Sequence, residues 1–143
     1  MKIKAAVTHA QGKDFSIEEV RLSGPKSNEV LVKVVATGVC HTDAVARDLA
    51  ISPYPIVLGH EGSGIVEQVG ENVTSLAAGD HVVMSFAHCG QCENCLTGHP
   101  TVCAAFNDLN FGGRMEDQTY RLHQGDTDLG TFFGQSSFGT PVV

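Results

Sequence analysis

Four cysteines within fifteen residues constrain this chain more than any other feature. Their spacing is C-x2-C-x2-C-x7-C, and they are Cys89, Cys92, Cys95 and Cys103. Short cysteine spacings let a loop wrap around one zinc ion, which prefers four soft ligands arranged as a tetrahedron. A site with four protein ligands has no open position, so its role would be structural. The spacing therefore predicts a zinc lobe over about residues 87–113, with the flanking His88 and His99 as alternative ligands.

The remaining cysteine argues against a disulfide framework. Cys40 brings the total to five, and the N-terminus lacks the apolar length of a secretory signal. Disulfide frameworks use paired cysteines in oxidising compartments, whereas clustered cysteines in a reducing compartment usually bind metal. No stretch approaches the roughly 18 apolar residues that cross a bilayer. We therefore expect a cytoplasmic protein that does not span a membrane.

The distribution of charge excludes two classes of partner. The chain has nine basic and sixteen acidic residues, a formal charge of −7. No Lys or Arg occurs between Arg47 and Arg114, while seven acidic residues do. Nucleic acids and anionic membrane surfaces are bound by clustered cations. We therefore expect neither of them as a partner.

The apolar pattern predicts a mainly β fold with short helices, of the α+β class. Alternating or β-branched runs bounded by turn residues predict strands at residues 3–7, 15–22, 29–36, 63–69, 81–86 and 136–143. Good helix formers preceded by Thr42 and Asp43 predict a short helix over residues 41–50. Residues 87–113 have no regular periodicity and are expected to form a loop. Many short strands with one or two helices favour a single domain built on a partly open β-barrel.

A second group of metal-binding side chains involves Cys40 and the run Gly59-His60-Glu61. A lone cysteine or histidine is more often a core residue than a ligand. Here each lies where a strand-like run gives way to a loop, beside glycines that permit close backbone approach. A Cys/His pair supplies two of the three protein ligands that an open, catalytic zinc site requires.

These motifs together resemble a known family. The zinc signature of the medium-chain alcohol dehydrogenases is similar to the run Gly59-His60-Glu61-x2-Gly64-x5-Gly70-x2-Val73 of this chain. The four clustered cysteines match the structural-zinc lobe of that family, and Cys40-His41-Thr42-Asp43 lies where the family places its first catalytic ligand. The stretch from Phe132 to Phe138 resembles the aryl (benzyl) alcohol branch. The similarity extends over the whole chain and implies a GroES-like barrel carrying a zinc-stapled lobe.

The resemblance also implies roles for individual residues. Cys40 and His60 would bind the catalytic zinc, and Glu61 would lie behind the metal or bind it transiently. Asp43 would fix the tautomer of His60 through a hydrogen bond. Thr42 would bind the substrate hydroxyl and begin the proton relay. His41 would approach the cofactor pyrophosphate, although an exposed histidine without that role fits the same position.

The resemblance implies hydride transfer from a primary, aromatic alcohol to NAD or NADP, with one structural and one catalytic zinc per full-length chain. Small-molecule alcohols and aldehydes would be the partners, and the full-length enzyme a homo-oligomer. The family's third catalytic ligand is a downstream cysteine, but no cysteine follows Cys103. No G-x-G-x-x-G motif marks a dinucleotide-binding domain either. We therefore expect residues 1–143 to be the catalytic domain alone, nearly inactive without a Rossmann cofactor domain.

Three alternatives remain open from the sequence. A polyol dehydrogenase or a formaldehyde–glutathione dehydrogenase would share the metal chemistry and differ in its pocket, for which Phe86 and Ile51 are candidate lining residues. A zinc-ribbon binding module would leave Cys40 and His60 unexplained. A structural, chaperonin-like barrel would need neither of these residues, because one fold can serve unrelated purposes.

Overall fold

The computed structural model describes all residues from 1 to 143. Its strands are β1 (Lys2–Thr8), β2 (Ser16–Leu22), β3 (Val30–Thr37), β4 (Ile56–Val57), β5 (Gly62–Val69), β6 (His81–Val83), β7 (Leu122–Gln124), β8 (Thr127–Thr131) and β9 (Gly139–Thr140). Its helices are α1 (His41–Leu49), α2 (Glu93–Leu96), the 3-10 helix η1 (Pro100–Val102) and α3 (Phe106–Phe111). None of these helices has the length and apolar character needed to span a bilayer.

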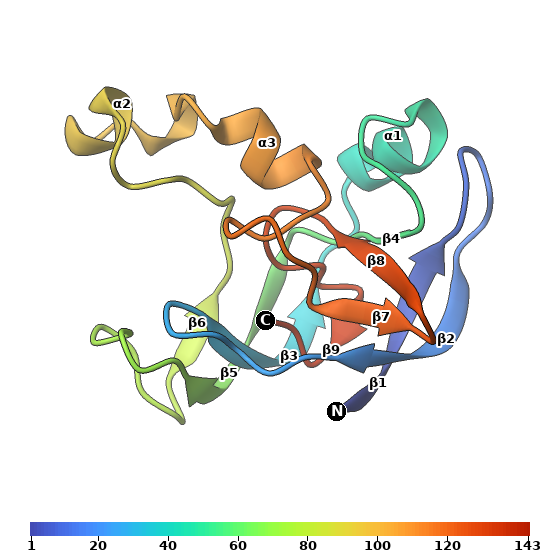
Figure 1. Cartoon of the computed structure of the whole chain (residues 1–143), viewed down its shortest axis with the longest axis horizontal. Coiled ribbons are helices and arrows are strands. Elements are labelled where there is room, and N and C mark those ends of the chain that lie inside the picture. The colour runs from blue at the N-terminus through green and yellow to red at the C-terminus, as the bar shows by residue number, and fades with distance from the viewer.

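The strands form a small barrel and a separate three-stranded sheet (Figure 1). The order β2-β7-β8-β4-β1 closes on itself because β1 also pairs with β2, and β9 pairs with the edge of β1 that also pairs with β4. The second sheet has the order β3-β5-β6. A bridge between Val32 and Val142 joins the two sheets, with backbone bonds of 2.8 and 3.0 Å. The expected α+β fold with a partly open barrel is confirmed.

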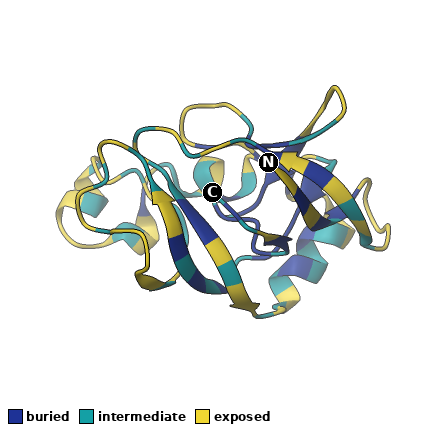
Figure 2. Ribbon diagram, turned by 90° about the horizontal axis from the view of Figure 1, so that it is seen from below, coloured by how far each residue is buried: buried dark blue, intermediate teal, exposed yellow.

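The apolar residues of the barrel strands alternate between the interior and the surface. Along β1 every second side chain faces the core, as Ile3, Ala5 and Val7 do, because successive residues of a strand point to opposite faces. A second apolar cluster joins α1 to the barrel through Ala46, Ile56, Leu58 and Phe132. Figure 2 shows the buried residues along the strands, whereas α2 and η1 contain none.

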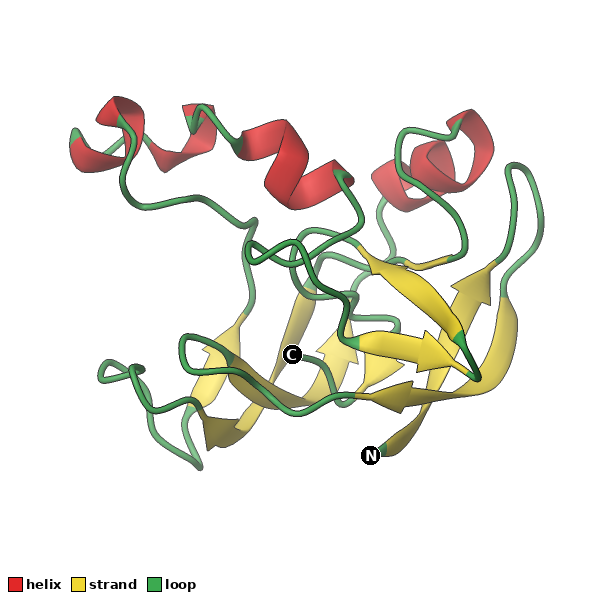
Figure 3. Ribbon diagram, viewed as in Figure 1, coloured by secondary structure: helices red, strands yellow, loops and turns green.

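The helices lie together along one side of the molecule, above the sheets (Figure 3). Helix α1 confirms the helix predicted from the sequence, and it ends where Ala50 adopts the left-handed conformation with φ 52°. Residues 87–113 were expected to lack regular structure, yet they contain α2, η1 and α3. These helices have six residues or fewer, which is too short for an apolar period to be visible in the sequence.

Two predicted strands are shorter in the structure for physical reasons, and the strands β4, β7 and β8 were not predicted. The strand predicted over residues 81–86 ends at Val83, because side chains take over the backbone bonds of Ser85 and Ala87. The strand predicted over residues 136–143 shrinks to Gly139–Thr140, since Phe133, Gly134 and Ser136 just before it have positive φ. The hairpin formed by β7 and β8 was not predicted from the sequence, although a two-residue Gly125-Asp126 turn connects its strands.

Candidate metal centres and active site

The four clustered cysteines come together as their spacing predicts. Cys92 caps α2, Cys95 lies within that helix, and Cys103 follows η1. The Sγ atoms of neighbouring members lie 3.5 Å apart for Cys92–Cys95 and Cys89–Cys103, and 4.0 Å apart for Cys89–Cys95 and Cys92–Cys103. All five cysteines of the chain are free thiols. The four sulfur atoms therefore form a compact cluster without disulfide bonds.

Backbone amides donate hydrogen bonds to this cluster of sulfur atoms. The Cys89 N–H donates to Cys103 Sγ at 3.4 Å, the Cys92 N–H donates to Cys89 Sγ at 3.4 Å, and the Ala104 N–H donates to Cys92 Sγ at 3.5 Å. Hydrogen bonds from Ala104 and then Cys95 lower the pKa of the Cys92 thiol to about 6. The pKa of Cys103 is also lowered, first by the Cys89 N–H. Desolvation and the neighbouring thiols raise the pKa of Cys95 to about 12. The amides therefore favour the thiolate form of Cys92 and Cys103, which is the metal-binding form of cysteine.

The two neighbouring histidines do not join the cysteine cluster. Potential metal-binding atoms in the lobe come from the four cysteines alone. The ring nitrogen Nδ1 of His99 faces Thr97 Oγ1 at 3.4 Å, and the His88 ring lies edge-on to Phe86 with centroids 6.1 Å apart. The structure thus gives no support to His88 or His99 as replacement ligands.

A second group of metal-binding atoms forms at the start of α1. Cys40, His60 and Glu61 place one sulfur, one ring nitrogen and one carboxylate oxygen within 4.8 Å of one another. Cys40 is the N-cap of α1, and His60 and Glu61 lie in the short connection from β4 to β5. Cys40 and His60 are half-buried and Glu61 is exposed. The fold therefore unites the residues that the sequence singled out in two separate motifs.

Asp43 connects both sides of this second group. It is only 1% exposed, and its Oδ2 accepts the Cys40 N–H at 3.1 Å. Its Oδ1 accepts the Gly59 N–H at 3.0 Å and lies 3.1 Å from His60 Nδ1. One carboxylate thus positions the residue before α1 and the ring of His60. With Nδ1 engaged by Asp43, the Nε2 atom of His60 is the ring nitrogen left for a metal.

The two remaining predicted site residues lie beside Cys40 on the first turn of α1. Thr42 places its Oγ1 3.5 Å from Cys40 Sγ. His41 is exposed and lies outside the group formed by Cys40, His60 and Glu61. The structure thus brings Thr42 to the candidate metal residues and leaves His41 facing solvent.

An aromatic cluster surrounds His60 and was not predicted as a unit. The His60 ring centroid lies 4.7 Å from that of Phe133 and 5.6 Å from that of Phe132. Phe133 in turn contacts Phe106 and Phe111 at centroid distances of 6.3 and 5.2 Å. The Phe86 ring lies 5.6 Å from that of Phe106. We call the rings of Phe86, Phe106 and Phe133 the aromatic wall. These phenylalanines are scattered along the sequence, so no local pattern reveals that they meet.

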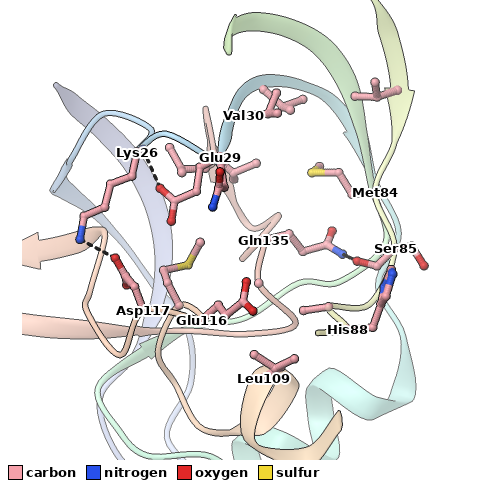
Figure 4. Close-up of a pocket in the computed structure, with 18 of the residues that line it drawn as sticks. Lys26, Glu29, Val30, Met84, Ser85, His88, Leu109, Glu116, Asp117 and Gln135 are labelled. Atoms are coloured by element: carbon pink, nitrogen blue, oxygen red, sulfur yellow. Dashed lines mark hydrogen bonds and ion pairs between the residues drawn. The ribbon is translucent and has the colours of Figure 1, made fainter. Parts of the chain in front are cut away.

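A cavity lies away from these residues, between the three-stranded sheet and the loop that precedes β7 (Figure 4). It has a volume of about 870 Å³ and includes Val30, Met84, Leu109 and Gln135 in its walls. Cys40, His60 and Glu61 do not line it. Ile51, a candidate pocket residue from the sequence, does not line it either.

Comparison with known proteins identifies the family. The family described as "Alcohol dehydrogenase GroES-like domain" matches residues 26–132. The chain belongs to this family. The match confirms the resemblance to zinc-type medium-chain alcohol dehydrogenases and the GroES-like barrel that it implies.

Relatives of this GroES-like domain include named dehydrogenases. It is 51% identical over 142 residues to the geraniol dehydrogenase of Castellaniella defragrans, covering 98% of the chain and 38% of the relative. It is 45% identical over 146 residues to the S-(hydroxymethyl)glutathione dehydrogenase of Escherichia coli, covering 100% of the chain and 40% of the relative. The chain spans about two fifths of the length of these relatives.

Solved structures match the GroES-like domain closely. An alcohol dehydrogenase zinc-binding domain protein from Burkholderia ambifaria superposes with a TM-score of 0.95 at 49% identity, over 99% of this chain and 39% of that one. The benzyl alcohol dehydrogenase of Acinetobacter calcoaceticus gives a TM-score of 0.92 at 47% identity, over 99% and 38% of the two chains.

Proposed function

We propose that this chain is the zinc-binding, alcohol-binding region of a nicotinamide-dependent dehydrogenase. The observation that carries the proposal is the meeting of Cys40, His60 and Glu61 within 4.8 Å, with Asp43 buried behind His60. The relatives named as geraniol and benzyl alcohol dehydrogenases support it. Because the chain spans about two fifths of those relatives, we place the dinucleotide-binding domain outside residues 1–143.

The four-cysteine lobe has the donors and dimensions of a structural zinc site. A tetrahedron with Zn–S bonds of about 2.3 Å has S–S edges of about 3.8 Å. The four sulfur separations of 3.5 to 4.0 Å bracket that edge. The lowered pKa values of Cys92 and Cys103 favour the thiolate form that zinc requires. We assign Cys89, Cys92, Cys95 and Cys103 to a closed site that stabilises the lobe.

The second group has the donors of an open zinc site. Sulfur, imidazole nitrogen and carboxylate oxygen are all zinc ligands, and three protein ligands leave a position for substrate. We assign Cys40 and His60 as ligands, and Glu61 as a group behind the metal or a third, transient ligand. Zinc held there would supply Lewis acidity that lowers the pKa of an alcohol hydroxyl.

The chain's own residues orient the site and move the proton. Asp43 holds His60 in the tautomer that presents Nε2, because Nδ1 faces its carboxylate at 3.1 Å. Thr42, with its hydroxyl 3.5 Å from Cys40 Sγ, would accept a hydrogen bond from the substrate hydroxyl and begin the proton relay, releasing its own hydroxyl proton to water as it takes up the proton of the substrate. His41 begins α1 and faces solvent, where it would meet the cofactor pyrophosphate.

The aromatic wall supports an aromatic or unsaturated primary alcohol as substrate. Phe133 lies against the His60 ring, and Phe106 and Phe86 continue the wall. Phenyl rings bind aromatic and unsaturated groups through apolar burial and edge-to-face contacts. S-(hydroxymethyl)glutathione is the alternative suggested by the Escherichia coli relative. Its carboxylates would need cations, and residues 48–113 contain no Lys or Arg.

Metal counting combined with a substrate comparison tests the proposal. We expect the wild-type chain, purified without chelators, to hold close to two zinc ions, and Cys40→Ser to hold one. In the natural protein that contains this chain, benzyl alcohol and geraniol should be oxidised faster than S-(hydroxymethyl)glutathione, with NAD or NADP as acceptor. One zinc in both proteins, together with no alcohol oxidation, would favour a zinc-stapled binding or structural module instead.

A further inference from the structure

Two buried carboxamides, those of Asn110 and Gln135, bind the segment that leads from β6 into the cysteine lobe. The Asn110 side chain is fully buried, and Gln135 is 4% exposed. Gln135 Nε2 donates to the Ser85 carbonyl at 3.1 Å, a bond drawn in Figure 4. Asn110 Oδ1 accepts the Ala87 N–H at 2.8 Å, and Asn110 Nδ2 donates to the Ala87 carbonyl at 2.9 Å.

The same two residues also bind the chain on the His60 side. Gln135 Oε1 accepts the Gly62 N–H at 3.2 Å, two residues beyond His60. The Asn110 carbonyl accepts the Phe133 N–H at 3.0 Å, and the Phe133 ring lies 4.7 Å from the His60 ring. Each of the two residues therefore connects residues 85–87, which lead into the cysteine lobe, with a residue close to His60 in sequence or in space.

These bonds begin where the strand ladder ends. Met84 N–H still donates to the Gly62 carbonyl at 2.8 Å, in continuation of the β5–β6 pairing. Beyond Met84, the backbone of Ser85 and Ala87 bonds to the side chains of Gln135 and Asn110 and no longer to a neighbouring strand. The Gly62 N–H is buried, and a buried backbone group without a partner costs about 1–3 kcal/mol, so an apolar side chain could not take the place of Gln135 without loss.

Phe86 lies between Ser85 and Ala87, the two residues that the carboxamides bind, and we call the hydrogen bonds of Asn110 and Gln135 the carboxamide clamp. Its ring reaches Phe106 at 5.6 Å, and Asn110 Nδ2 also donates to the Phe106 carbonyl at 2.7 Å. The clamp thereby fixes the backbone on both sides of Phe86 and at Phe106 and Phe133. All three rings belong to the aromatic wall, of which Phe133 contacts His60.

We propose that Asn110 and Gln135 are positioning residues that set the separation between the aromatic wall and the metal-binding loop. Through this separation they select aromatic over small alcohols, a role that rests on the function proposed above. Neither side chain forms a hydrogen bond with a candidate ligand, so they act through Phe86, Phe133 and Gly62. Selectivity of this kind depends on small displacements, since about 1 Å of misplacement can cost a hundred-fold in rate.

Kinetics of the natural protein that contains this chain test the selectivity. We expect Gln135→Leu to lower the ratio of kcat/KM for benzyl alcohol to that for ethanol by about ten-fold, mainly through KM for benzyl alcohol. Gln135→Glu keeps the acceptor for Gly62 and loses the donor to Ser85, so it isolates the bond to the lobe. Val20→Ala is the stability control, because Val20 belongs to the separate barrel core. Equal losses for both alcohols in Gln135→Leu would overturn the proposal.

A measurement on the 143-residue chain tests the clamp without activity. The Cε atom of Met84 packs on Gly62, where an added Cβ would fall 2.1 Å from it. The chain has three methionines, so 13C-methyl labelling gives three signals, which Met84→Leu assigns. Gln135→Leu should shift the Met84 signal and speed hydrogen exchange at the Gly62 amide, and Val20→Ala should do neither. An unchanged Met84 signal and Gly62 exchange rate would overturn the clamp itself, whereas a wild type that oxidises neither alcohol would overturn the proposed function.

Discussion

Asp43 Oδ1 and His60 Nδ1 lie 3.1 Å apart, although the two residues are 17 positions apart in the sequence. The same carboxylate accepts the Cys40 N–H and the Gly59 N–H. Asp43 thus fixes two candidate ligands at once from a position that is 1% exposed. A partner of this kind sets the orientation and basicity of a metal-binding histidine.

Replacing Asp43 should weaken metal binding at the Cys40/His60 site more than it weakens the lobe. We expect Asp43→Asn to lower zinc affinity there by about 10–100-fold, because the amide cannot present an anionic acceptor to His60 and both backbone amides. Competition with a coloured chelator would resolve the weak site from the tight one. The His123–Asp128 pair, with atoms 2.7 Å apart and an exposed carboxylate, offers the control Asp128→Asn. Equal affinities in the two variants would contradict a role for Asp43 at the metal.

Gly59, which precedes His60, cannot accept a side chain. Its φ is +90°, and a Cβ would fall 2.5 Å from the Phe138 backbone nitrogen and 2.8 Å from Ser137 Oγ. Gly79 has a similar φ of +96° with nothing within 4 Å of its Cβ position. Gly79→Ala should therefore cost only the backbone strain, about 1–2 kcal/mol. Gly59→Ala should cost about 4 kcal/mol or more in urea unfolding, because the overlap with Phe138 adds to that strain. Similar losses at both positions would show that the packing around Gly59 yields easily.

The parts of this molecule that the sequence predicts are those encoded in local patterns. The strand at residues 3–7 and the helix that starts at His41 follow from side-chain alternation and from helix-start residues. The cysteine lobe follows from ligand spacing, and the meeting of Cys40 with His60 follows from the family resemblance. The strand, the helix and the cysteine spacing are each visible within fifteen residues or fewer, whereas the meeting of Cys40 with His60 is visible only through the resemblance.

The parts that it does not predict depend on contacts between distant segments. Gln135 bonds to Gly62 and Ser85, 73 and 50 positions away, and no periodic pattern accompanies such a bond. The aromatic wall likewise joins Phe86 and Phe106 to Phe133 only after the chain has folded. Side-chain to backbone bonds of this kind ended the predicted strand early at Val83.

Because the guanidinium of Arg121 is buried, we expect replacement of its partner Glu29 to lower the stability of the fold strongly. Arg121 is 2% exposed, and its Nε and Nη2 atoms lie 2.8 and 2.5 Å from the Glu29 carboxylate. Glu29→Ala would leave a buried charge with Asp117 as its only acidic partner, so we expect a loss of about 3 kcal/mol in urea unfolding. The exposed Lys26–Asp117 pair supplies the control Lys26→Ala, which should cost less than about 1 kcal/mol. A loss at Glu29 no greater than that at Lys26 would mean that Asp117 alone satisfies Arg121.

Glu18 predicts how stability depends on pH in the acidic range. Hydrogen bonds from Ser16, His9 and Gln124 lower the pKa of Glu18 from its usual 4.5 to about 2. Because the unfolded chain takes up this proton at a higher pH than the folded chain, the stabilisation is complete above about pH 4.5 and is lost as the pH falls toward 2. Thermal unfolding at intervals across this window should show a steeper fall in Tm for the wild type than for Glu18→Gln. Glu19→Gln is the control, since Glu19 is exposed and pairs only with exposed Lys2. It should keep the wild-type slope, whereas parallel curves for the wild type and Glu18→Gln would mean that other carboxylates control acid unfolding.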